Sequence, residues 1–314
     1  MDFCLYNPEH GYYMTKENIF GPEGDYYTSP YTHRLFSQCL ADAFAHYFQL
    51  LARQSPFHLV ELGIGEGRLG HDILTRLQET HLGVFNEVRY YPVEAEDDLP
   101  DKINGIVFSN EFFDALPVHR VRARDTELRE IYVYIDEVIS EIEGEIADPR
   151  IMEYMRMGFK KWKNDHEYEV NLRMIDVLED LDRRIDSAIV LTVDYGYTWE
   201  EYQTIDRPQG TLLCYYRHQA VKDPYINLCD QDITAHVNFE VMTKVGETLG
   251  WRSKSLTTQR RFLHEWGLEK HLIEEEAQGI LNSERVEERL GLGTLLRPGG
   301  ISDTMKVLVQ EVRI

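Results

Sequence analysis

Short apolar runs and helical periodicity alternate along the chain, and the pattern is clearest between residues 58 and 77. Residues 58–62 form an apolar run with the length of a buried strand, and a glycine-rich turn follows. Leu69, Ile73 and Leu77 then recur at the spacing of one helix face. The pattern predicts a strand, a tight turn and an amphipathic helix.

The same two signals predict most of the other elements. Helices are expected where apolar residues recur with a period near 3.6, and strands where apolar runs are short or alternate with polar residues. The predicted strands cover residues 88–94, 105–109, 188–196, 210–219 and 304–312, with paired strands over 118–138; the predicted helices cover residues 35–51, 149–163, 170–184, the latter part of 232–251 and 257–268. We therefore expect an α/β fold with a mainly parallel sheet.

The order of these elements divides the chain into four segments. Residues 1–57 hold a loop-rich start and a helix, and we expect them to supply an N-terminal lid. Residues 58–117 form the binding half of the sheet domain, and residues 118–187 interrupt it as an inserted α+β cap. Residues 188–314 return to the sheet as its second half. No linker rich in Gly, Ser or Pro marks an independent domain.

The glycine-rich turn indicates a binding site for a nucleotide-like ligand. Gly63, Gly65 and Gly67 can adopt positive φ, and the N–H groups of the following helical turn attract an anionic group. Glu61 inside the strand suits a ligand with an ammonium, and Glu94 at the end of the next strand suits a ribose with free hydroxyls. Together these favour S-adenosylmethionine over NAD. Two alternatives stay open: a strand-to-helix connection without a ligand, and an NAD-dependent oxidoreductase.

Polar residues also follow two other predicted strands. Asn110, Glu111 and Asp114 come directly after residues 105–109, and Asp194 with Tyr195 closes residues 188–196. Ligands of open parallel sheets bind at the carboxyl ends of the strands, so these positions are candidate site residues. The alternative for the first group is a helix N-cap made by Asn110 or Asp114.

Composition and charge narrow the classes of partner. The chain has 314 residues and a formal charge of −22, from 33 Lys and Arg against 55 Asp and Glu. Such a surface repels nucleic acid and favours a basic protein partner. The four cysteines are scattered and form no CxxC pair, which indicates reduced thiols and no metal site. No signal peptide, transit peptide or membrane-spanning run is visible, so we expect a cytoplasmic protein.

Several longer motifs resemble one known family. They are YNPEHGYY, GPEGDYYTSP, ELGIGEG, NEFFDALPV, VDYGY, DITAHVNF, TQRRFL and TMKVL, spread in order over nearly the whole chain. The chain is similar in these to the MidA family of S-adenosylmethionine-dependent methyltransferases, which includes a mitochondrial complex I assembly factor that methylates arginine. The resemblance implies a class I methyltransferase fold, Rossmann-like, with flanking helices and an antiparallel last strand.

The resemblance also implies a role for each matched position. Gly63, Gly65 and Gly67 would hold the methionine end of the cofactor, Glu94 its ribose, and Asn110 with Glu111 would lie beside the reacting methyl; Asp25, Thr28, Ser29 and Pro30 would form a lid over the cofactor; Asp194, Asp232, Thr234 and His236 would border the substrate.

The sequence departs from the family pattern at two places. Ile64 stands inside the glycine turn, where the family commonly has Pro. After Glu94 the chain reaches Gly105 in ten residues, where the family usually adds a helix and a strand. We therefore expect the strand after the second one to be shortened or missing. The exposed sheet edge left there would allow two copies of the chain to pair.

The leading hypothesis is methylation of a protein side chain, with arginine as the acceptor. Glu111 and Asp114 are the expected carboxylates that hold the guanidinium, with Asp194 or Glu169 as a further partner. Tyr195 would border the acceptor, and His236 would take up the proton. The main alternative is an inactive protein of the same fold that acts as a binding or assembly factor, and we expect no metal in either case.

Overall fold

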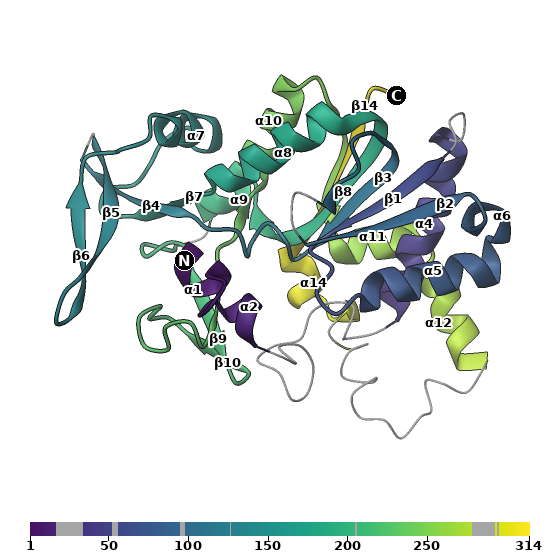
Figure 1. Ribbon diagram of the computed structural model, residues 1–314, viewed down its shortest axis with the longest axis horizontal. Coiled ribbons are helices and arrows are strands. Elements are labelled where there is room, and N and C mark those ends of the chain that lie inside the picture. Colours follow the sequence, from purple (N-terminus) through teal and green to yellow (C-terminus); the bar gives the residue numbers. More distant parts are fainter. Residues whose placement is uncertain are drawn as a thin grey trace. The chain divides into compact units, whose positions relative to one another are not determined.

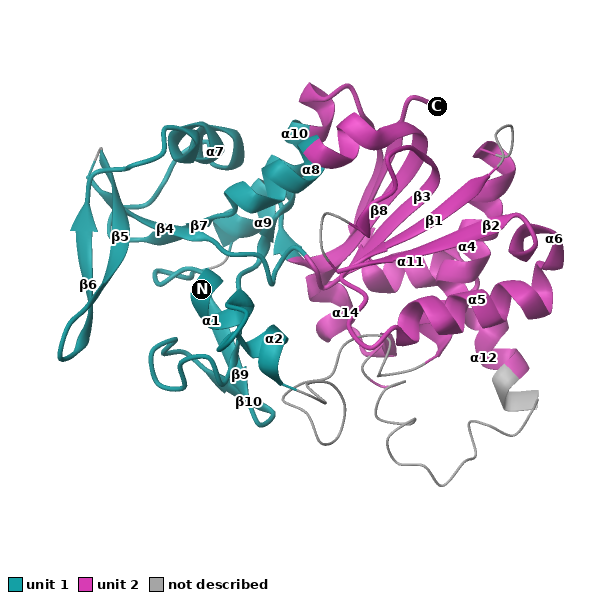
Figure 2. Cartoon of the chain, in the orientation of Figure 1, with its two compact units in different colours: residues 1–27, 113–179, 196–245 teal, residues 28–112, 180–195, 246–314 magenta. Residues whose placement is uncertain are grey.

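The structure, a computed structural model, describes residues 1–16, 34–51, 56–94, 98–125, 127–204, 206–277, 293 and 295–314. The chain divides into two compact units, coloured separately in Figure 2. Unit 1 comprises residues 1–27, 113–179 and 196–245, and unit 2 comprises residues 28–112, 180–195 and 246–314.

A twisted, mainly parallel sheet organises unit 2 (Figure 1). Its strands are β1 (Phe57–Leu62), β2 (Val88–Val93), β3 (Ile103–Asn110), β8 (Ile185–Tyr197), β13 (Arg252–Thr258) and β14 (Met305–Val312), in the order β13-β14-β8-β3-β1-β2. The strands from β2 to β8 are parallel, whereas β14 runs antiparallel to β8 and β13. The expected fold class and antiparallel last strand are confirmed.

Helices pack on this sheet through apolar stripes. Unit 2 contains α4 (Leu35–Leu51), α5 (Arg68–Thr80), α6 (Leu82–Phe85), α11 (Gln259–Glu265), α12 (Leu268–Ala277) and α14 (Ile301–Thr304). In α4, Phe36, Leu40, Phe44 and Tyr47 recur every three or four residues and are buried. Phe44 meets Phe108 of β3 at a ring-centroid distance of 5.0 Å, so α4 and the sheet share one core.

Strand β2 lies at the edge of the sheet. Among the described residues it pairs only with β1, and β3 lies on the other side of β1. Pro92 is tolerated in β2 because an edge strand does not need every backbone donor. The predicted loss of the strand after β2 is therefore confirmed for the described part of the chain.

The described residues of unit 1 form two antiparallel sheets and six helices, the last turns of α8 and α10 extending into unit 2. One sheet has the order β6-β5-β4-β7 and the other the order β10-β9-β11. Their strands are β4 (His119–Arg124), β5 (Glu127–Ile135), β6 (Ile139–Gly144), β7 (Glu167–Val170), β9 (Leu213–Tyr216), β10 (Gln219–Val221) and β11 (Asp232–Thr234); the helices are α1 (Asp2–Tyr6), α2 (Tyr12–Thr15), α7 (Arg150–Gly158), α8 (Leu172–Arg184), α9 (Trp199–Thr204) and α10 (Phe239–Thr248). A short strand, β12 (Val237–Asn238), pairs with Gly196 and Tyr197 at the end of β8.

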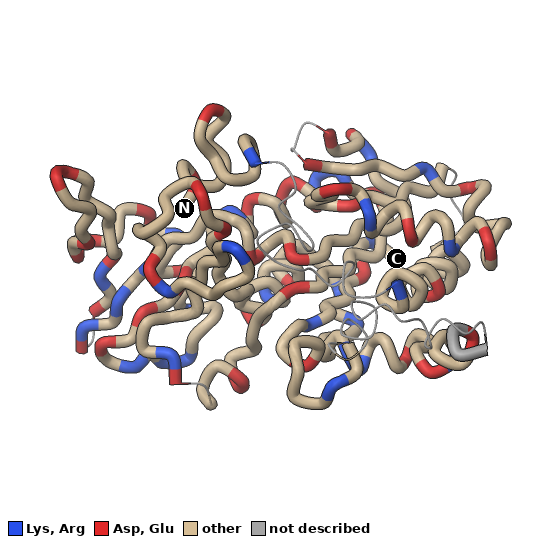
Figure 3. The backbone as a smooth tube through the Cα atoms, turned by 90° about the horizontal axis from the view of Figure 1, so that it is seen from below, with Lys and Arg blue, Asp and Glu red and all other residues tan. Residues whose placement is uncertain are grey.

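Basic and acidic residues are interspersed along the chain (Figure 3). The three arginines of β4 illustrate this: Arg120 and Arg122 both pair with Glu167, and Arg124 donates to Glu143 from Nε at 2.9 Å. These cross-strand pairs neutralise the positive charges of the three arginines in β4.

Two predictions about the elements need correction, and one strand was missed. Residues 210–219 do not add a strand to the main sheet; they contribute to the β9–β10 hairpin of the three-stranded sheet in unit 1. Residues 196–245 lie in unit 1, although the sequence grouped them with the second half of the sheet domain. Strand β13 was not predicted, because its residues RSKSLTT are polar and pair at an edge with β14.

Most other predicted elements are confirmed. The helix over 35–51, the strands beginning at residues 57, 88 and 103 and the paired strands after residue 118 all form, with shifts of one or two residues at their ends. The helix expected over 149–163 is shorter, since α7 ends at Gly158. Within the described residues, no helix has the length and apolar character needed to cross a membrane. All four cysteines are free thiols, and the described residues contain no metal-ligand cluster.

A partly buried acid–histidine cluster joins α4, the junction of α5 and α6, and α12 in unit 2. Asp42 of α4 contacts His81 Nε2 at 3.0 Å and His271 Nε2 of α12 at 3.1 Å. Burial alone would raise the pKa of Asp42, but the hydrogen bonds to His271 and His81 outweigh burial and lower that pKa to about 2. The carboxylate form is therefore stabilised by folding.

We expect Asp42→Asn to lower the free energy of unfolding by about 2 kcal/mol at pH 7. Because the folded pKa lies below the unfolded value of 3.8, this stabilisation is present above pH 3.8 and is lost as the pH falls to about 2. Denaturant unfolding measured across this range checks it, with the exposed Asp101→Asn as matched control. Equal stability of Asp42→Asn and wild type at pH 7 would contradict it.

Candidate functional site

The turn between β1 and α5 has the backbone that the glycines predict. Gly63, Gly65 and Gly67 have φ of 70°, 52° and 72°, a region that side-chain-bearing residues rarely adopt. Gly63 donates to Val93 O at 2.8 Å, which links the turn to the end of β2. A Cβ on Gly63 would stand 2.8 Å from the Phe112 ring, so this position also lacks room for a side chain.

Glu94 folds back over the same turn. Its Oε1 accepts a hydrogen bond from Gly65 N at 2.7 Å, while the side chain stays exposed. The structure thus brings Glu94 and the glycines together, as the resemblance implied. A carboxylate at the open side of this turn is available to a ligand that has hydroxyl donors.

Glu61 lies beneath the turn and is buried. Its carboxylate accepts hydrogen bonds from the Tyr90 hydroxyl of β2 and from the backbone N–H of Gly70 in α5. Gly70 must lack a side chain, since a Cβ there would lie 2.4 Å from Glu61 Oε2. Burial raises the pKa of Glu61 to about 7. Its contact with a ligand ammonium stays a prediction; in this structure Glu61 joins β1 to β2 and α5.

The polar residues after β3 do not cap a helix. Residues 111–118 form bends and irregular backbone, so the N-cap alternative is wrong. Glu111 has a positive φ of 53°, and its N–H donates to Val193 O of β8 at 2.9 Å. Asn110 Nδ2 donates to Glu111 Oε1 at 3.1 Å. This arrangement holds the Glu111 side chain in one orientation at the carboxyl end of β3.

Asp194 and Tyr195 close the unit 2 part of β8. Asp194 is fully buried, and its Oδ1 accepts from Tyr195 N at 2.8 Å. Both residues pair in register with β14, Asp194 opposite Lys306 and Tyr195 opposite Met305. The candidate site residues predicted in unit 2 therefore lie at or near the ends of β1, β2, β3 and β8.

The residues of this strand edge fit S-adenosylmethionine. The turn offers backbone with the left-handed conformation of an anion-binding nest, next to an exposed carboxylate on Glu94. The Asn110 Oδ1 is buried and has no hydrogen-bond partner among the described residues. A buried acceptor in that state calls for a donor from water or a ligand.

The other predicted site residues lie in unit 1. Asp114 is buried, and its carbonyl accepts from Ala235 N at 2.9 Å. Asp232 Oδ1 accepts from the Tyr13 hydroxyl at 2.6 Å, and Thr234 Oγ1 donates weakly to Leu213 O at 3.4 Å. In this structure Asp232 and Thr234 thus hold β11 to its neighbours.

A chain of hydrogen bonds connects Glu169 with His236. Thr211 donates to Glu169 from its N–H at 2.8 Å and from Oγ1 at 2.9 Å, and His236 N donates to Thr211 Oγ1 at 3.0 Å. Burial, followed by the charge of Arg207, lowers the pKa of His236 to about 3. Its imidazole is therefore neutral at pH 7 and holds an added proton weakly, and its role as proton acceptor stays a prediction.

The segment that follows β3 is held by three donors from different parts of unit 1. Asn171 Nδ2 donates to Phe113 O at 2.9 Å, Ala235 N to Asp114 O at 2.9 Å and the Tyr6 hydroxyl to Ala115 O at 3.0 Å. Sequence reasoning singled out the YNPEHGYY motif without assigning Tyr6 this contact. Asn171, Thr211 and Tyr90 were missed because nothing in their local pattern differs from ordinary polar positions.

The lid residues Asp25, Thr28, Ser29 and Pro30 lie outside the described residues. Unit 1 and unit 2 each carry part of the predicted set: Glu61, the three glycines, Glu94, Asn110, Glu111, Asp194 and Tyr195 in unit 2, and Asp114, Glu169, Asp232, Thr234 and His236 in unit 1.

Comparison with known proteins gives consistent matches. The family model described as "Putative S-adenosyl-L-methionine-dependent methyltransferase" matches residues 39–102 and 96–257. The crystal structure of a "likely methyl transferase" from Burkholderia thailandensis bound to S-adenosyl-homocysteine is 25% identical, with a TM-score of 0.84, and covers 100% of this chain and 86% of its own. These matches confirm the class I methyltransferase fold and the expected cofactor, S-adenosyl-L-methionine.

Curated relatives carry a more specific name. The mitochondrial "Protein arginine methyltransferase NDUFAF7 homolog" of Drosophila melanogaster is 26% identical over 78% of this chain and 65% of its own length. The mouse protein arginine methyltransferase NDUFAF7 is also 26% identical, over 87% of this chain and 70% of its own. The chain thus spans less than two thirds of the length of the Drosophila relative.

Glu61 generates a prediction about pH. Because its folded pKa of about 7 lies above the ordinary 4.5, the folded state binds the proton more tightly, and stability falls as the pH rises from 4.5 to about 7. We expect Glu61→Gln to remove most of this fall, which amounts to about 3 kcal/mol. Denaturant unfolding at several pH values measures it, with the exposed Glu66→Gln in the same turn as control. If the free energy of unfolding of Glu61→Gln falls with pH as steeply as that of the wild type, the buried Glu61 carboxyl is not the cause of this fall.

Proposed function

Because this chain belongs to the family of S-adenosyl-L-methionine-dependent methyltransferases, we propose that it transfers a methyl group to a protein side chain, with arginine as the acceptor. The observation that carries the proposal is the edge of unit 2, where a left-handed glycine turn, Glu94 and the constrained Asn110–Glu111 pair follow strand ends of one sheet. The names of the relatives from fly and mouse support arginine as the acceptor.

The glycine turn and Glu94 are the proposed cofactor-binding residues. Gly63, Gly65 and Gly67 would bind the amino-acid end of the cofactor, and Glu94 its ribose hydroxyls. When bound, the cofactor supplies a methyl group already activated on a sulfonium sulfur. The chain therefore needs to position the acceptor nitrogen in line and to accommodate the proton that this nitrogen releases.

Carboxylates suit the arginine acceptor. A guanidinium donates paired hydrogen bonds to a carboxylate, and such bonds orient one nitrogen for attack. Glu111 is our proposed catalytic residue, because its backbone is held in a left-handed conformation by Val193 and its carboxylate is oriented by Asn110. Asp114, three residues further on, is the proposed second carboxylate, and a basic protein segment is the proposed partner.

Isothermal titration with S-adenosylmethionine, S-adenosylhomocysteine and NAD tests the cofactor. We expect micromolar binding of the two sulfur compounds, none of NAD, and loss of about tenfold in affinity for Glu94→Gln, since the ribose loses a charged acceptor. Binding of NAD alone would overturn the proposal in favour of an oxidoreductase.

Transfer of labelled methyl to a pool of synthetic arginine peptides tests catalysis. We expect Glu111→Gln to keep cofactor affinity and to lower kcat by about 100-fold or more, because the neutral amide cannot hold the guanidinium or the released proton. Glu87→Gln, an exposed residue before β2, is the matched control. Label recovered on residues other than arginine would refute the acceptor, and undiminished kcat in Glu111→Gln would refute its role.

In the part of the chain that the structure describes, no strand lies beyond β2, and this favours a second candidate function. The fold would then be retained as a binding or assembly factor without methyl transfer, and the chain would bind neither sulfur compound while keeping a protein partner. The cytoplasmic location stays a prediction.

We also propose that the edge of β2 pairs two copies of the chain, because an unpaired edge offers free backbone donors and acceptors. Sedimentation equilibrium should show a dimer. Because Val93 O accepts from Gly63 N, alternate residues of β2 face β1 and Val88 faces the open edge. Val88→Pro removes a backbone donor from that edge and should shift the dimer toward monomer. A wild-type chain that sediments only as a monomer would end this proposal.

A further inference from the structure

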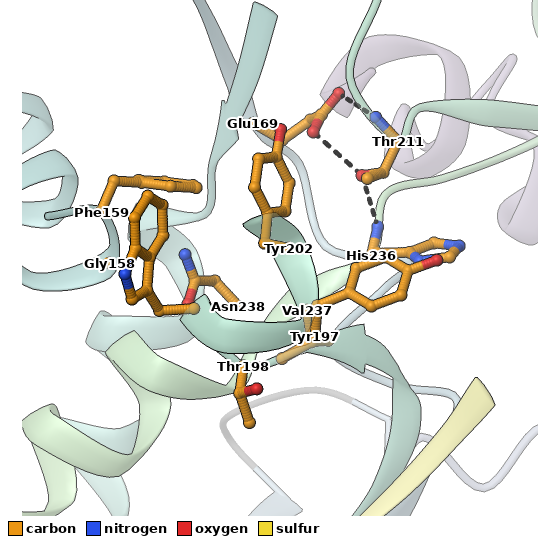
Figure 4. A pocket seen from close by; sticks show the side chains of 11 residues that line it. Gly158, Phe159, Glu169, Tyr197, Thr198, Tyr202, Thr211, His236, Val237 and Asn238 are labelled. Carbon is orange, nitrogen blue, oxygen red and sulfur yellow. Dashed lines mark hydrogen bonds between the residues drawn. The ribbon is translucent and has the colours of Figure 1, made fainter. Parts of the chain in front are cut away.

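A pocket in unit 1 combines aromatic walls with a buried carboxylate (Figure 4). Its lining includes Phe159, Tyr197, Trp199, Tyr202, His236 and Glu169. These residues come from the end of α7, the end of β8, α9, β7 and the loop after β11. Segments far apart in the sequence therefore contribute to one small site.

The aromatic rings enclose the pocket at steep angles to one another. Phe159 and Trp199 have ring centroids 6.0 Å apart at 90°, and Phe159 and Tyr202 are 5.2 Å apart at 75°. Tyr197 meets Tyr202 at 6.5 Å and 71°. Rings at these distances are in direct contact, so they form a continuous aromatic wall of the pocket. The faces of such rings carry a negative quadrupole that attracts a cation.

Glu169 lies in this pocket without a cationic partner. It is 8% exposed and accepts from Thr211 N, Thr211 Oγ1 and Leu212 N at 2.8, 2.9 and 3.2 Å. No lysine or arginine in the described residues forms an ion pair with it. Since a carboxylate offers about four acceptor positions, one remains for a further donor. Burial raises the pKa of Glu169, so a bound cation would relieve the cost of its charge.

Tyr202 supplies a second unsatisfied group. Its hydroxyl is buried and has no hydrogen-bond partner among the described residues. Buried hydroxyls without a partner are rare, and each calls for a water or a ligand. The pocket thus contains an acceptor with spare capacity and a hydroxyl that lacks a partner.

The volume limits what can enter. The space inside the pocket measures about 20 Å³, which is enough for about one water molecule or one terminal nitrogen of a side chain. Arg207 already lies over the Tyr197 ring at 5.6 Å, so one ring of this set makes a cation–π contact with a guanidinium.

We propose that this pocket binds the guanidinium of an arginine side chain presented by the protein acceptor. The proposal rests on the proposed function, which already names arginine, and it adds a binding pocket for that side chain. One terminal nitrogen enters the pocket beside the rings, where Glu169 and the Tyr202 hydroxyl accept its hydrogens. Tyr197 follows Asp194 by three residues along β8.

Titration with N-acetyl-arginine amide, followed by tryptophan fluorescence and calorimetry, tests the proposal on the full chain. The neutral isostere N-acetyl-citrulline amide should bind at least about tenfold more weakly, because it lacks the cation. Tyr202→Phe should weaken arginine binding by roughly 3- to 10-fold without a loss of stability, since its hydroxyl has no partner to lose. Tyr134→Phe, at an exposed tyrosine of unit 1, is the matched control and should bind like wild type.

Glu169→Gln gives a second readout and should weaken arginine binding by at least about tenfold. Equal binding of arginine and citrulline amides, no binding of either, or unchanged affinity in Tyr202→Phe would overturn the proposal and leave a water site only. Tighter binding of N-acetyl-lysine amide than of N-acetyl-arginine amide would indicate that the pocket prefers an ammonium, and this would also overturn the proposal. Cofactor titration of the same samples separates the failures: loss of S-adenosylmethionine binding in wild type refutes the proposed function, whereas intact cofactor binding without arginine binding refutes only this pocket.

Discussion

The left-handed backbone between β1 and α5 is the constraint on which the candidate cofactor edge depends. Every second residue of this turn has a positive φ: the values are 70°, 52° and 72° at Gly63, Gly65 and Gly67. A side chain at Gly63 would meet Phe112, and one at Gly70 would meet Glu61 and Tyr90. The turn therefore brings α5 close over the buried end of β1, and it leaves the Gly65 N–H for the carboxylate of Glu94.

Buried and partly buried carboxylates in this protein are stabilised in different ways, and the difference has functional consequences. Asp42 has two histidines, and its pKa falls to about 2. Glu61 has a hydroxyl and an amide in place of a cation, and its pKa rises to about 7. Glu169 also relies on neutral donors, but it lies in an aromatic-walled pocket. The two histidines satisfy the carboxylate of Asp42, whereas the carboxylate of Glu169 keeps an acceptor position for a cation from outside the chain.

The segment after β3 connects the two sets of candidate residues along the chain. Its backbone is irregular, so no helix or sheet satisfies its carbonyls, and donors from Asn171, Ala235 and Tyr6 do so instead. These contacts explain how a loop without regular structure is held in one conformation inside unit 1. They also give the N-terminal motif a structural role, since Tyr6 reaches a residue 109 positions away in the sequence.

The sequence alone determined the elements whose signals are local. The glycine turn, the helix over residues 35–51 and the polar ends of β3 and β8 follow from periodicity and residue type. The short stretch after Glu94 predicted the loss of a strand, and the described residues contain no strand beyond β2. Edge strand β13 escaped because its polar residues are paired only by a neighbour from the far end of the chain.

Only the tertiary structure decided which polar residues meet. Residues 210–219 alternate like a sheet strand, yet their partner is β11, and that pairing is set by contacts with α1 and α2. The link from Glu169 through Thr211 to His236 spans 67 positions, and the ring set around Tyr202 draws on three separate segments. Such contacts depend on how the chain folds back on itself, and no local pattern of residues encodes them.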